Sequence, residues 1–266
     1  MLATFALRPS SAKRLIARGI SQMPEVVRAM SEGRIIITGG TTNGFVAEEL
    51  GIEIHEKGAF TAGVVTDGLP CMTDAEKMET FPICLDKGKA VNTPWLEFLA
   101  GFNKNDVFIK GANAIDPDGN AGILLGNPLG GTIGASIGML TALGCHLIVP
   151  VGYEKLIPSC KKAAETMGLL LVDKSLGMRM GFMQLSTAQV VTEVEALQTL
   201  CGVQATVVGA GGIGGMEGAT VLAVQGDESK VEQAMRLART LMKEKPLKSF
   251  RRSCKGCPLP CSFVGK

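Results

Sequence analysis

The stretch that decides the fold is DVFIKGANAIDPDGNAGILLGNPLGGTIGASIGMLTALG, residues 106–144. It contains two short apolar runs, the first of which ends in Lys110 and is followed by an Asp-Pro-Asp-Gly turn. The second run leads to a Gly-Gly-Thr sequence that opens a helix of small residues. Residues 119–153 contain no Asp, Glu, Lys or Arg, so we expect them to form the buried centre of the molecule. Because α/β proteins bind ligands between strand ends and helix starts, the entrance to this segment is a predicted binding site.

Strands and helices alternate on both sides of this stretch. Arg34–Ile37 is a β-branched run typical of a buried parallel strand, and a Gly/Thr-rich loop and a short helix follow it. Residues 147–151 and 169–172 have the composition of further strands, with a helix between them. The alternation predicts βα units around a parallel sheet, an α/β ligand-binding core that we place at residues 1–177.

The pattern changes after residue 177. We expect strands at residues 178–185, 205–208 and 219–224, and helices at residues 190–200 and 227–242. A capping box at residues 186–189 favours the start of the first helix. This order predicts a small ferredoxin-like α+β domain at residues 178–248, a split βαβ unit without its last strand. Residues 249–266 are predicted to form a separate cysteine-rich tail.

The predicted ligand site combines backbone amides, hydroxyl groups and one lysine, which together suit a phosphate or a carboxylate. We expect the following residues to bind the ligand: Thr38, Gly39, Gly40, Thr41, Thr42, Asn43, Lys110, Gly111, Asn113, Asp116, Gly130, Gly131 and Thr132. Two alternatives stay open. Thr41 or Thr42 could merely cap the helix that follows, and Lys110 could pair with Asp116 or Asp118.

Two short motifs resemble a known superfamily. ITGGTTNGFVAEEL, residues 37–50, resembles the Gly-Ser/Thr-Thr phosphate loop of the NagB/RpiA/CoA-transferase-like superfamily, which includes ribose-5-phosphate isomerase. IKGANAIDPDGN, residues 109–120, resembles that isomerase's Asp-Gly-Ala-Asp-Glu-Ile-Asp-Pro stretch. The resemblance covers roughly residues 34–175. It implies a Rossmann-like parallel sheet of the isomerase/CoA-transferase type with a small ferredoxin-like domain beside it.

The departures from this resemblance bear on function. Lys110, Asn113 and Ala114 stand where the isomerase has Asp, Asp and Glu, and only Asp116 is retained. Moving a proton between sugar carbons needs a carboxylate or an imidazole at the C–H bond, and no Glu occurs between residues 97 and 154. The glutamate nucleophile of the CoA transferases has no match either. The sequence therefore predicts an anion-binding crevice and leaves open whether the protein is an enzyme.

A glycine-rich stretch, GAGGIGG at residues 209–215, has the spacing of a dinucleotide-binding loop. That motif needs a helix to follow immediately, whereas residues 219–224 are predicted to be a strand, so we expect no nicotinamide cofactor. A flexible hairpin that closes over the crevice and a plain glycine-rich turn both remain open.

Three of the eight cysteines, Cys254, Cys257 and Cys261, are clustered near the C-terminus with the spacing C-x2-C-x3-C. The stretch resembles the Cys-x-x-Cys-Pro-x-x-Cys of aldehyde ferredoxin oxidoreductases, in which a distant fourth cysteine completes a [4Fe–4S] site. Thiolates suit Zn²⁺ equally well. The fourth ligand would come from a partner subunit or from one of three cysteines elsewhere: Cys201, Cys71 or Cys84. The alternative is a frayed tail with incidental cysteines.

Composition excludes some classes of partner. The 266 residues carry a net charge of +2 with one Trp and one Tyr, which argues against nucleic acid. Residues 119–153 could cross a bilayer by length, but their Asn, His, Pro and Gly content argues against a membrane span. Scattered cysteines without a secretory signal favour the cytoplasm. We therefore expect a cytoplasmic homo-oligomer that binds a small phosphorylated or acyl-type anion, with an iron–sulfur or zinc redox/accessory protein as the alternative.

Overall fold

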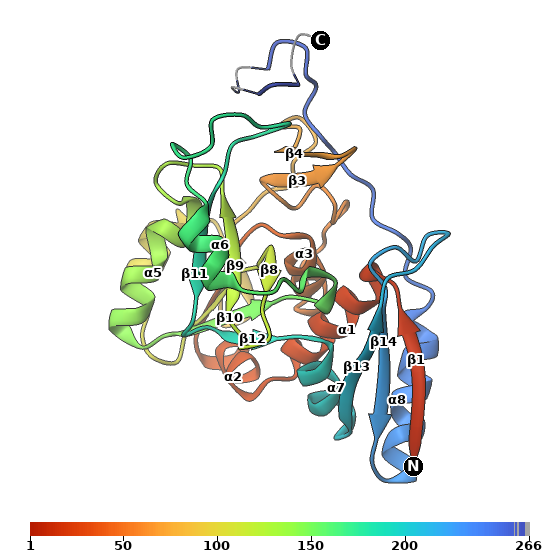
Figure 1. Ribbon diagram of the computed structural model, residues 1–266. Helices are drawn as coiled ribbons and strands as arrows, with labels where there is room; N and C mark the ends of the chain where they lie inside the picture. The colour runs from red at the N-terminus through yellow and green to blue at the C-terminus, as the bar shows by residue number, and fades with distance from the viewer. Residues whose placement is uncertain (258, 260, 264–266) are drawn as a thin grey trace.

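The computed structural model describes residues 1–257, 259 and 261–263 and shows a mixed α/β protein (Figure 1). Its largest sheet has six strands in the order β12-β10-β7-β2-β5-β6. These strands are β2 (Arg34–Ile37), β5 (Ile83–Asp86), β6 (Lys89–Val91), β7 (Val107–Ile109), β10 (His146–Pro150) and β12 (Gln189–Val191). Strands β12, β10, β7 and β2 run parallel to one another. Strand β5 pairs antiparallel with β2 on one side and with β6 on the other. The predicted α/β class is confirmed, although the sheet is mixed.

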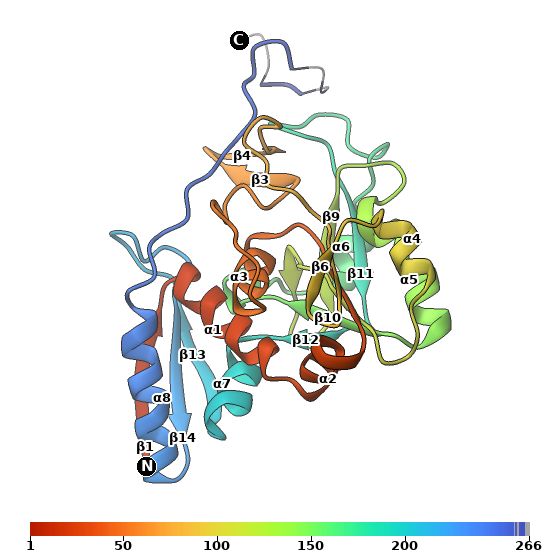
Figure 2. The ribbon, with the colours of Figure 1, turned by 180° about the vertical axis from the view of Figure 1, so that it is seen from behind.

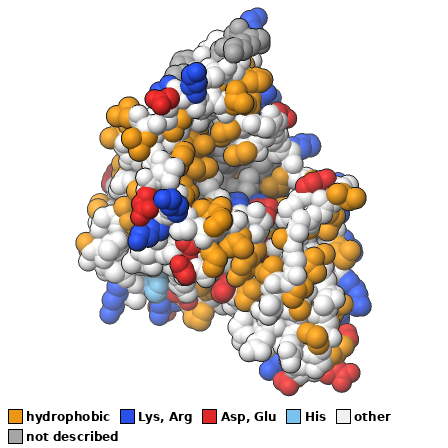
Figure 3. All heavy atoms as spheres, viewed as in Figure 1, with side chains coloured by type: hydrophobic (Ala, Val, Ile, Leu, Met, Phe, Trp, Pro, Cys, Tyr) orange, Lys and Arg blue, Asp and Glu red, His pale blue; other side chains and the backbone are white. Residues whose placement is uncertain are grey.

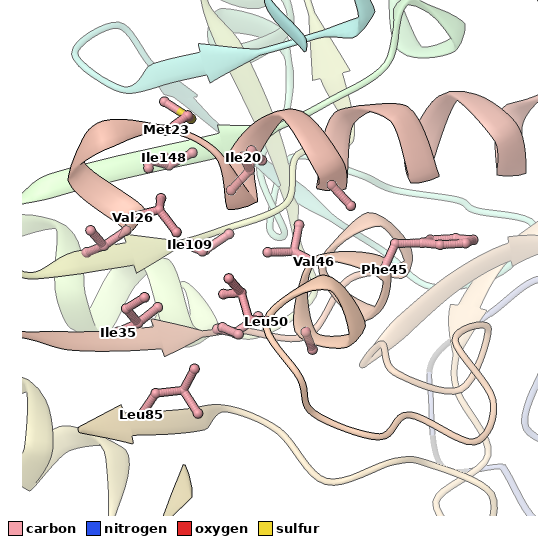
Figure 4. Packing of buried hydrophobic residues seen from close by; sticks show 14 of the residues in the cluster. Ile20, Met23, Val26, Ile35, Phe45, Val46, Leu50, Leu85, Ile109 and Ile148 are labelled. Carbon is pink, nitrogen blue, oxygen red and sulfur yellow. The ribbon is translucent and has the colours of Figure 1, made fainter. Parts of the chain in front are cut away.

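Three helices cover one face of this sheet: α1 (Pro9–Ser21), α2 (Pro24–Glu32) and α3 (Thr41–Glu49). Their apolar side chains pack against the β-branched residues of the strands (Figure 4). Ile20 and Val46 from the helices and Ile35 and Ile109 from the strands are all fully buried there. This layer fixes α3 against the sheet, and α3 begins where β2 ends.

The other face is covered by α4 (Trp95–Ala100), by α5 (Gly131–Leu143) and by a second, antiparallel sheet. That sheet contains β8 (Ala114–Ile115), β9 (Ala121–Leu125) and β11 (Gly181–Leu185). Apolar residues of these elements, such as Ile123 and Leu140, form one cluster with Phe108 of β7.

The predicted burial of residues 119–153 is only partly confirmed. Strand β10 is almost wholly buried, but Leu129, Met139 and Leu143 are 85%, 39% and 45% exposed. The reason is that α5 lies at the edge of the molecule, with one side facing solvent (Figures 1 and 2). Within the described part of the chain, no helix combines the length and apolarity needed to cross a membrane.

A third sheet is antiparallel and has the order β1-β14-β13. It consists of β1 (Leu2–Leu7), β14 (Thr220–Gln225) and β13 (Gln204–Ala210), and α7 (Glu193–Cys201) and α8 (Glu228–Leu241) accompany it. Leu15 of α1 belongs to the same buried cluster as Leu197 of α7 and Val231 of α8. Helix α1 therefore contributes to the cores of both the large sheet and this small sheet.

Several predicted elements in this region are wrong. Within the predicted strand at residues 178–185, only residues 181–185 form a strand, β11, and they pair with β9 and not with the small sheet, whose third strand is β1. Residues 189–191 form β12 because they pair with β10. The helix consequently begins at Glu193, so the predicted capping box at residues 186–189 is wrong. Residues 169–172 form a turn instead of the predicted strand.

The remaining elements are β3 (Gly63–Thr66), β4 (Leu69–Met72), the 3-10 helix η1 (Tyr153–Lys155) and α6 (Cys160–Thr166). Strands β3 and β4 form a hairpin. After α8 the chain runs in extended form past the small sheet to this hairpin, as Figure 2 shows. The C-terminal segment thus lies far from α8 and close to residues 63–72.

Candidate ligand-binding crevice

The two loops that the sequence predicts to face one another lie side by side. Strands β2 and β7 are parallel neighbours that end in register at Ile37 and Ile109. Thr38 donates hydrogen bonds to the Ile109 carbonyl from its backbone N–H at 3.0 Å and from its hydroxyl at 3.1 Å. Asn43, in the first turn of α3, donates its Nδ2 to the Thr38 carbonyl at 2.8 Å. The carboxyl ends of parallel strands are where such sheets bind ligands, so the placement fits the predicted crevice.

Packing explains one of the two glycines of the first loop, Gly39. A Cβ on Gly39 would lie 2.7 Å from ring atoms of Phe81, and the N–H of Gly40 donates to the Phe60 carbonyl at 2.6 Å. Phe60 and Phe81 form an edge-to-face pair with ring centroids 5.5 Å apart. Gly39 therefore lets the loop lie flat against this aromatic pair, and the loop is held in place before any ligand arrives.

Helix α3 begins without a side-chain cap. Its N-cap residue is Gly40, and among the described residues no side chain caps its first turn. The alternative in which Thr41 or Thr42 caps the helix is therefore wrong. The first amide groups of a helix have no partner within the helix, and the helix dipole makes this end favourable for an anion. The uncapped end of α3 lies where β2 ends.

Asn43 has a buried oxygen without a partner. The residue is fully buried, and among the described residues none donates a hydrogen bond to its Oδ1. Gly111, in the loop after β7, lies beside this oxygen, since a Cβ on that glycine would be 3.5 Å away. An unpaired buried acceptor is costly, so a donor supplied from outside the protein would be stabilised here.

Two lysines converge on the loop after β7. Lys110 donates its Nζ to the Gly111 carbonyl at 3.1 Å, and Lys155 of η1 donates its Nζ to the Ala112 carbonyl at 2.8 Å. Desolvation by burial lowers the pKa of Lys110 to about 8. Burial, together with the positive charges of Lys13 and Lys110, also lowers the pKa of Lys155 to about 8, although the nearby carboxylates of Glu154 and Glu193 partly offset this. Both ammonium groups are therefore charged near neutral pH, although less stably than a lysine in water.

Neither lysine has a carboxylate partner within the described part of the chain. The alternative in which Lys110 pairs with Asp116 or Asp118 is therefore wrong. Asp116 instead accepts hydrogen bonds from the backbone N–H groups of Asn120 at 2.9 Å and Cys160 at 2.9 Å. Burial raises the pKa of Asp116, but these hydrogen bonds outweigh it and lower the pKa. Asp116 thus holds the turn between β8 and β9 to the start of α6.

A buried carboxylate lies at the same edge of the sheet, and sequence reasoning missed it. Glu193 follows β12, is fully buried, and accepts hydrogen bonds from the Tyr153 N–H at 3.1 Å and the Thr220 hydroxyl at 3.2 Å. Burial raises its pKa. Next to it, Glu154 forms an ion pair with Lys13. Lys155 and Glu193 both come from segments that follow parallel strands, and this is the only sequence signal that could have indicated them.

The remaining predicted ligand residues lie outside this group of contacts. Asn113 is exposed, and its Oδ1 accepts a hydrogen bond from the Leu124 N–H at 3.0 Å, which aligns β8 with β9. The segment from Gly130 through Gly131 to Thr132 forms the start of α5 after β9. Within the described part of the chain, no hydrogen bond joins this helix start to the loops after β2 and β7. The structure therefore brings together the predicted residues of the loops after β2 and β7, but not those at the start of α5.

Figure 3 shows a hollow in this face of the molecule, between the β3–β4 hairpin and the small sheet. Hydrophobic side chains border the hollow, and basic and acidic side chains lie at its lower edge. The glycine-rich loop between β13 and β14 forms the neighbouring wall, where a Cβ on Gly218 would be 3.6 Å from a carboxylate oxygen of Glu154. Strand β14 follows this loop, as predicted, so the loop lacks the helix of a dinucleotide site.

A separate cavity of about 400 Å³ lies between α3 and the segment after α8. Its lining residues are Phe45, His55, Glu56, Lys57, Thr240, Lys243, Glu244, Lys245, Pro246, Leu247 and Lys248. Most of its charged groups already form ion pairs, such as Lys57 with Glu48 at 2.6 Å and Glu244 with Arg14 at 2.7 Å. None of the residues predicted from the sequence lines this cavity.

No protein-family model matches the chain, and neither a curated protein nor a solved structure matches it. The superfamily resemblance of residues 37–50 and 109–120 therefore remains a hypothesis.

Proposed function

We propose that this protein binds a small anionic metabolite, phosphorylated or acyl-type, in the crevice at the carboxyl ends of β2, β7 and β10. The observation that carries the proposal is the pair of lysines on the loop after β7. Lys110 and Lys155 donate to adjacent carbonyl groups, at Gly111 and Ala112, and neither forms an ion pair in the described part of the chain, although the carboxylates of Glu154 and Glu193 lie near Lys155. Two desolvated cations that repel each other are stabilised when an anion arrives between them.

The uncapped start of α3 supports the same conclusion. The first amide groups of a helix have no partner within the helix, and the helix dipole adds a partial positive charge at this end. Asn43 connects this helix start to the β7 loop and offers one unpaired acceptor, which suits a hydroxyl or N–H group of the ligand. A ligand with an anionic group and a neighbouring hydrogen-bond donor would satisfy all of these groups.

The proposal concerns binding and assigns no reaction. Glu193 is a buried carboxylate with a raised pKa, as general acids often are, but its two hydrogen bonds already hold it between η1 and β14. A positioning role accounts for these contacts. At the positions that match the isomerase's acidic motif this chain retains only Asp116, and the Asp116 carboxylate accepts the backbone N–H groups of Asn120 and Cys160.

Binding is tested by thermal stabilisation and calorimetry with a panel of sugar phosphates and CoA esters. We expect at least one compound to bind, and Lys110→Ala or Lys155→Ala to weaken it by roughly 10-fold or more, because each removes a charge-assisted hydrogen bond. Lys104→Ala is the matched control, since Lys104 is exposed near the opposite end of β7. Unchanged affinity in both crevice variants, or no binding across the panel, would rule the proposal out.

A further inference from the structure

The C-terminal segment is anchored to the β3–β4 hairpin. Arg252 donates its N–H to the Met72 carbonyl at 3.0 Å, and Asp74 donates its N–H to the Phe250 carbonyl at 2.8 Å. Thr73 and Arg251 form an antiparallel bridge between these bonds. Backbone pairing therefore extends the hairpin as far as Arg252, so the alternative of a frayed tail is wrong for residues 250–252.

This anchoring brings four cysteines around one small cavity. The cavity has a volume of about 20 Å³, and its lining includes Cys71 of β4 together with Cys254, Cys257 and Cys261 of the tail. Cys71 is nearly buried, at 8% exposure. The thiols thus come from two segments that lie far apart in sequence.

The two other cysteines that the sequence offers as a fourth ligand are in hydrophobic cores. Cys84 lies in β5, in the core under α4, and Cys201 ends α7 beside the small sheet. Burial raises the pKa of Cys84 to about 11, so its thiol keeps its proton at neutral pH. Neither residue lines the cavity.

The tail sulfurs are held in place by hydrogen bonds. The N–H groups of Gly177 and Phe263 donate to Cys261 Sγ at 3.2 and 3.3 Å, and Arg251 donates its Nη1 to Cys254 Sγ at 3.3 Å. Contacts of this kind around a sulfur orient it toward a shared site. Ser262 also donates its N–H to the Ser175 carbonyl at 2.8 Å, which holds the loop around Gly177 against the tail.

We propose that Cys71, Cys254, Cys257 and Cys261 bind a single Zn²⁺ ion and that the ion pins the tail to β4. Four thiolates in a tetrahedral set are a closed structural site for zinc.

The four thiols line the cavity without being close enough to one another to coordinate an ion in this conformation. Among the described residues, no three His, Cys, Asp or Glu side chains have an arrangement that holds a metal ion. Binding therefore requires the thiols to move inward and to release their protons. Gly256, with a φ of 71°, gives the Cys254–Cys257 turn a backbone shape that other residues rarely adopt.

The test is a zinc titration of the reduced, chelator-stripped full-length protein, in competition with a chromophoric chelator. We expect one equivalent of Zn²⁺ to bind, and Co²⁺ in its place to give the absorption of tetrahedral thiolate coordination. Cys71→Ser should lower zinc affinity by roughly 100-fold or more, because it removes one of four ligands. Cys84→Ala, Cys201→Ala and Cys145→Ser should bind as the wild type does.

Cys257→Ser provides a second readout in case Cys71→Ser does not fold, since Cys257 is half-buried and donates its N–H to the Cys254 carbonyl within the tail. Zinc should also protect residues 249–263 from limited proteolysis in the wild type, but not in Cys257→Ser. Three results would overturn the proposal: no zinc binding by the reduced wild type, equal binding by Cys71→Ser, or purification with iron and acid-labile sulfide. The lysine variants of the crevice leave this assay unchanged, so the two proposals fail independently.

Discussion

Asn43 connects the loop after β2 to the loop after β7 with one side chain. Its Nδ2 bonds to the Thr38 carbonyl at 2.8 Å and lies 3.4 Å from the Ile109 carbonyl. We expect Asn43→Ala to lower the free energy of unfolding by about 1–3 kcal/mol, because a fully buried carbonyl loses its donor. Urea denaturation measures this, with Asn105→Ala as the exposed control. Equal stability of the two variants would show that the hydrogen bonds of the Asn43 side chain do not contribute to the free energy of unfolding.

Lys110 and Lys155 make ligand affinity depend on pH. Their pKa values are lowered to about 8, so both lose their protons as the pH rises from 7 to 9. Affinity for an anion of fixed charge should therefore be highest below pH 7 and fall by roughly tenfold per lysine by pH 9. Calorimetry at pH 7, 8 and 9 measures the fall, and the double variant Lys110→Ala/Lys155→Ala should show none. A flat wild-type profile would mean that the lysines do not face the ligand.

The sequence indicates some single residues of the crevice and not others. Lys110 and Thr38 can be predicted because each directly follows a buried β-branched or apolar run, and such runs end at the binding edge. Lys155 and Glu193 follow strands as well, but their segments look like ordinary charged loops and helix starts. Only the strand order, which local sequence does not contain, places them beside Lys110.

Among the elements, the contact between α1 and α7 depends on one glycine. A Cβ on Gly19 would lie 2.7 Å from the Cα of Ala196. We expect Gly19→Ala to destabilise the protein by about 1–3 kcal/mol, because the two helices would have to separate. Gly138, in α5, is the matched control, since nothing lies within 4 Å of its added Cβ. Gly138→Ala should be neutral or stabilise by up to about 1 kcal/mol, because alanine favours helix.

Thermal denaturation of the two alanine variants, compared with the wild type, checks this pair. If both glycine variants changed stability by the same amount, helix propensity alone would account for both changes. The α1–α7 contact would then have no special role.

Element boundaries near β12 show how tertiary pairing overrides local signals. Residues 186–189 and residues 192–195 both have the Ser/Thr-x-x-Glu/Gln pattern of a capping box. The structure uses the second, in which Thr192 and Glu195 exchange hydrogen bonds. The first is excluded because residues 189–191 pair with β10 in the parallel sheet. Sequence alone cannot rank the two, since the deciding hydrogen bonds come from residues 148–150.

For the molecule as a whole, the α/β class and the adjacency of the two loops follow from strand and helix alternation. The small sheet does not follow from it. Sequence predicts strands β13 and β14, but the third strand, β1, comes from residues 2–7, and it pairs Leu2 with Gln225, far away in the sequence. Helix α1 then packs on both sheets. Such long-range pairing has no local signature, so the predicted order of residues 178–248 lacked one strand and wrongly included another.

The pairing of β1 with β14 also sets an order of events during synthesis. Strand β1 leaves the ribosome before its partner, because β14 and α8 are made after the complete six-stranded sheet has emerged. Residues 2–7 must therefore stay without this partner, with their edge exposed, until residues 220–225 have been made. The small sheet would then close after the large one.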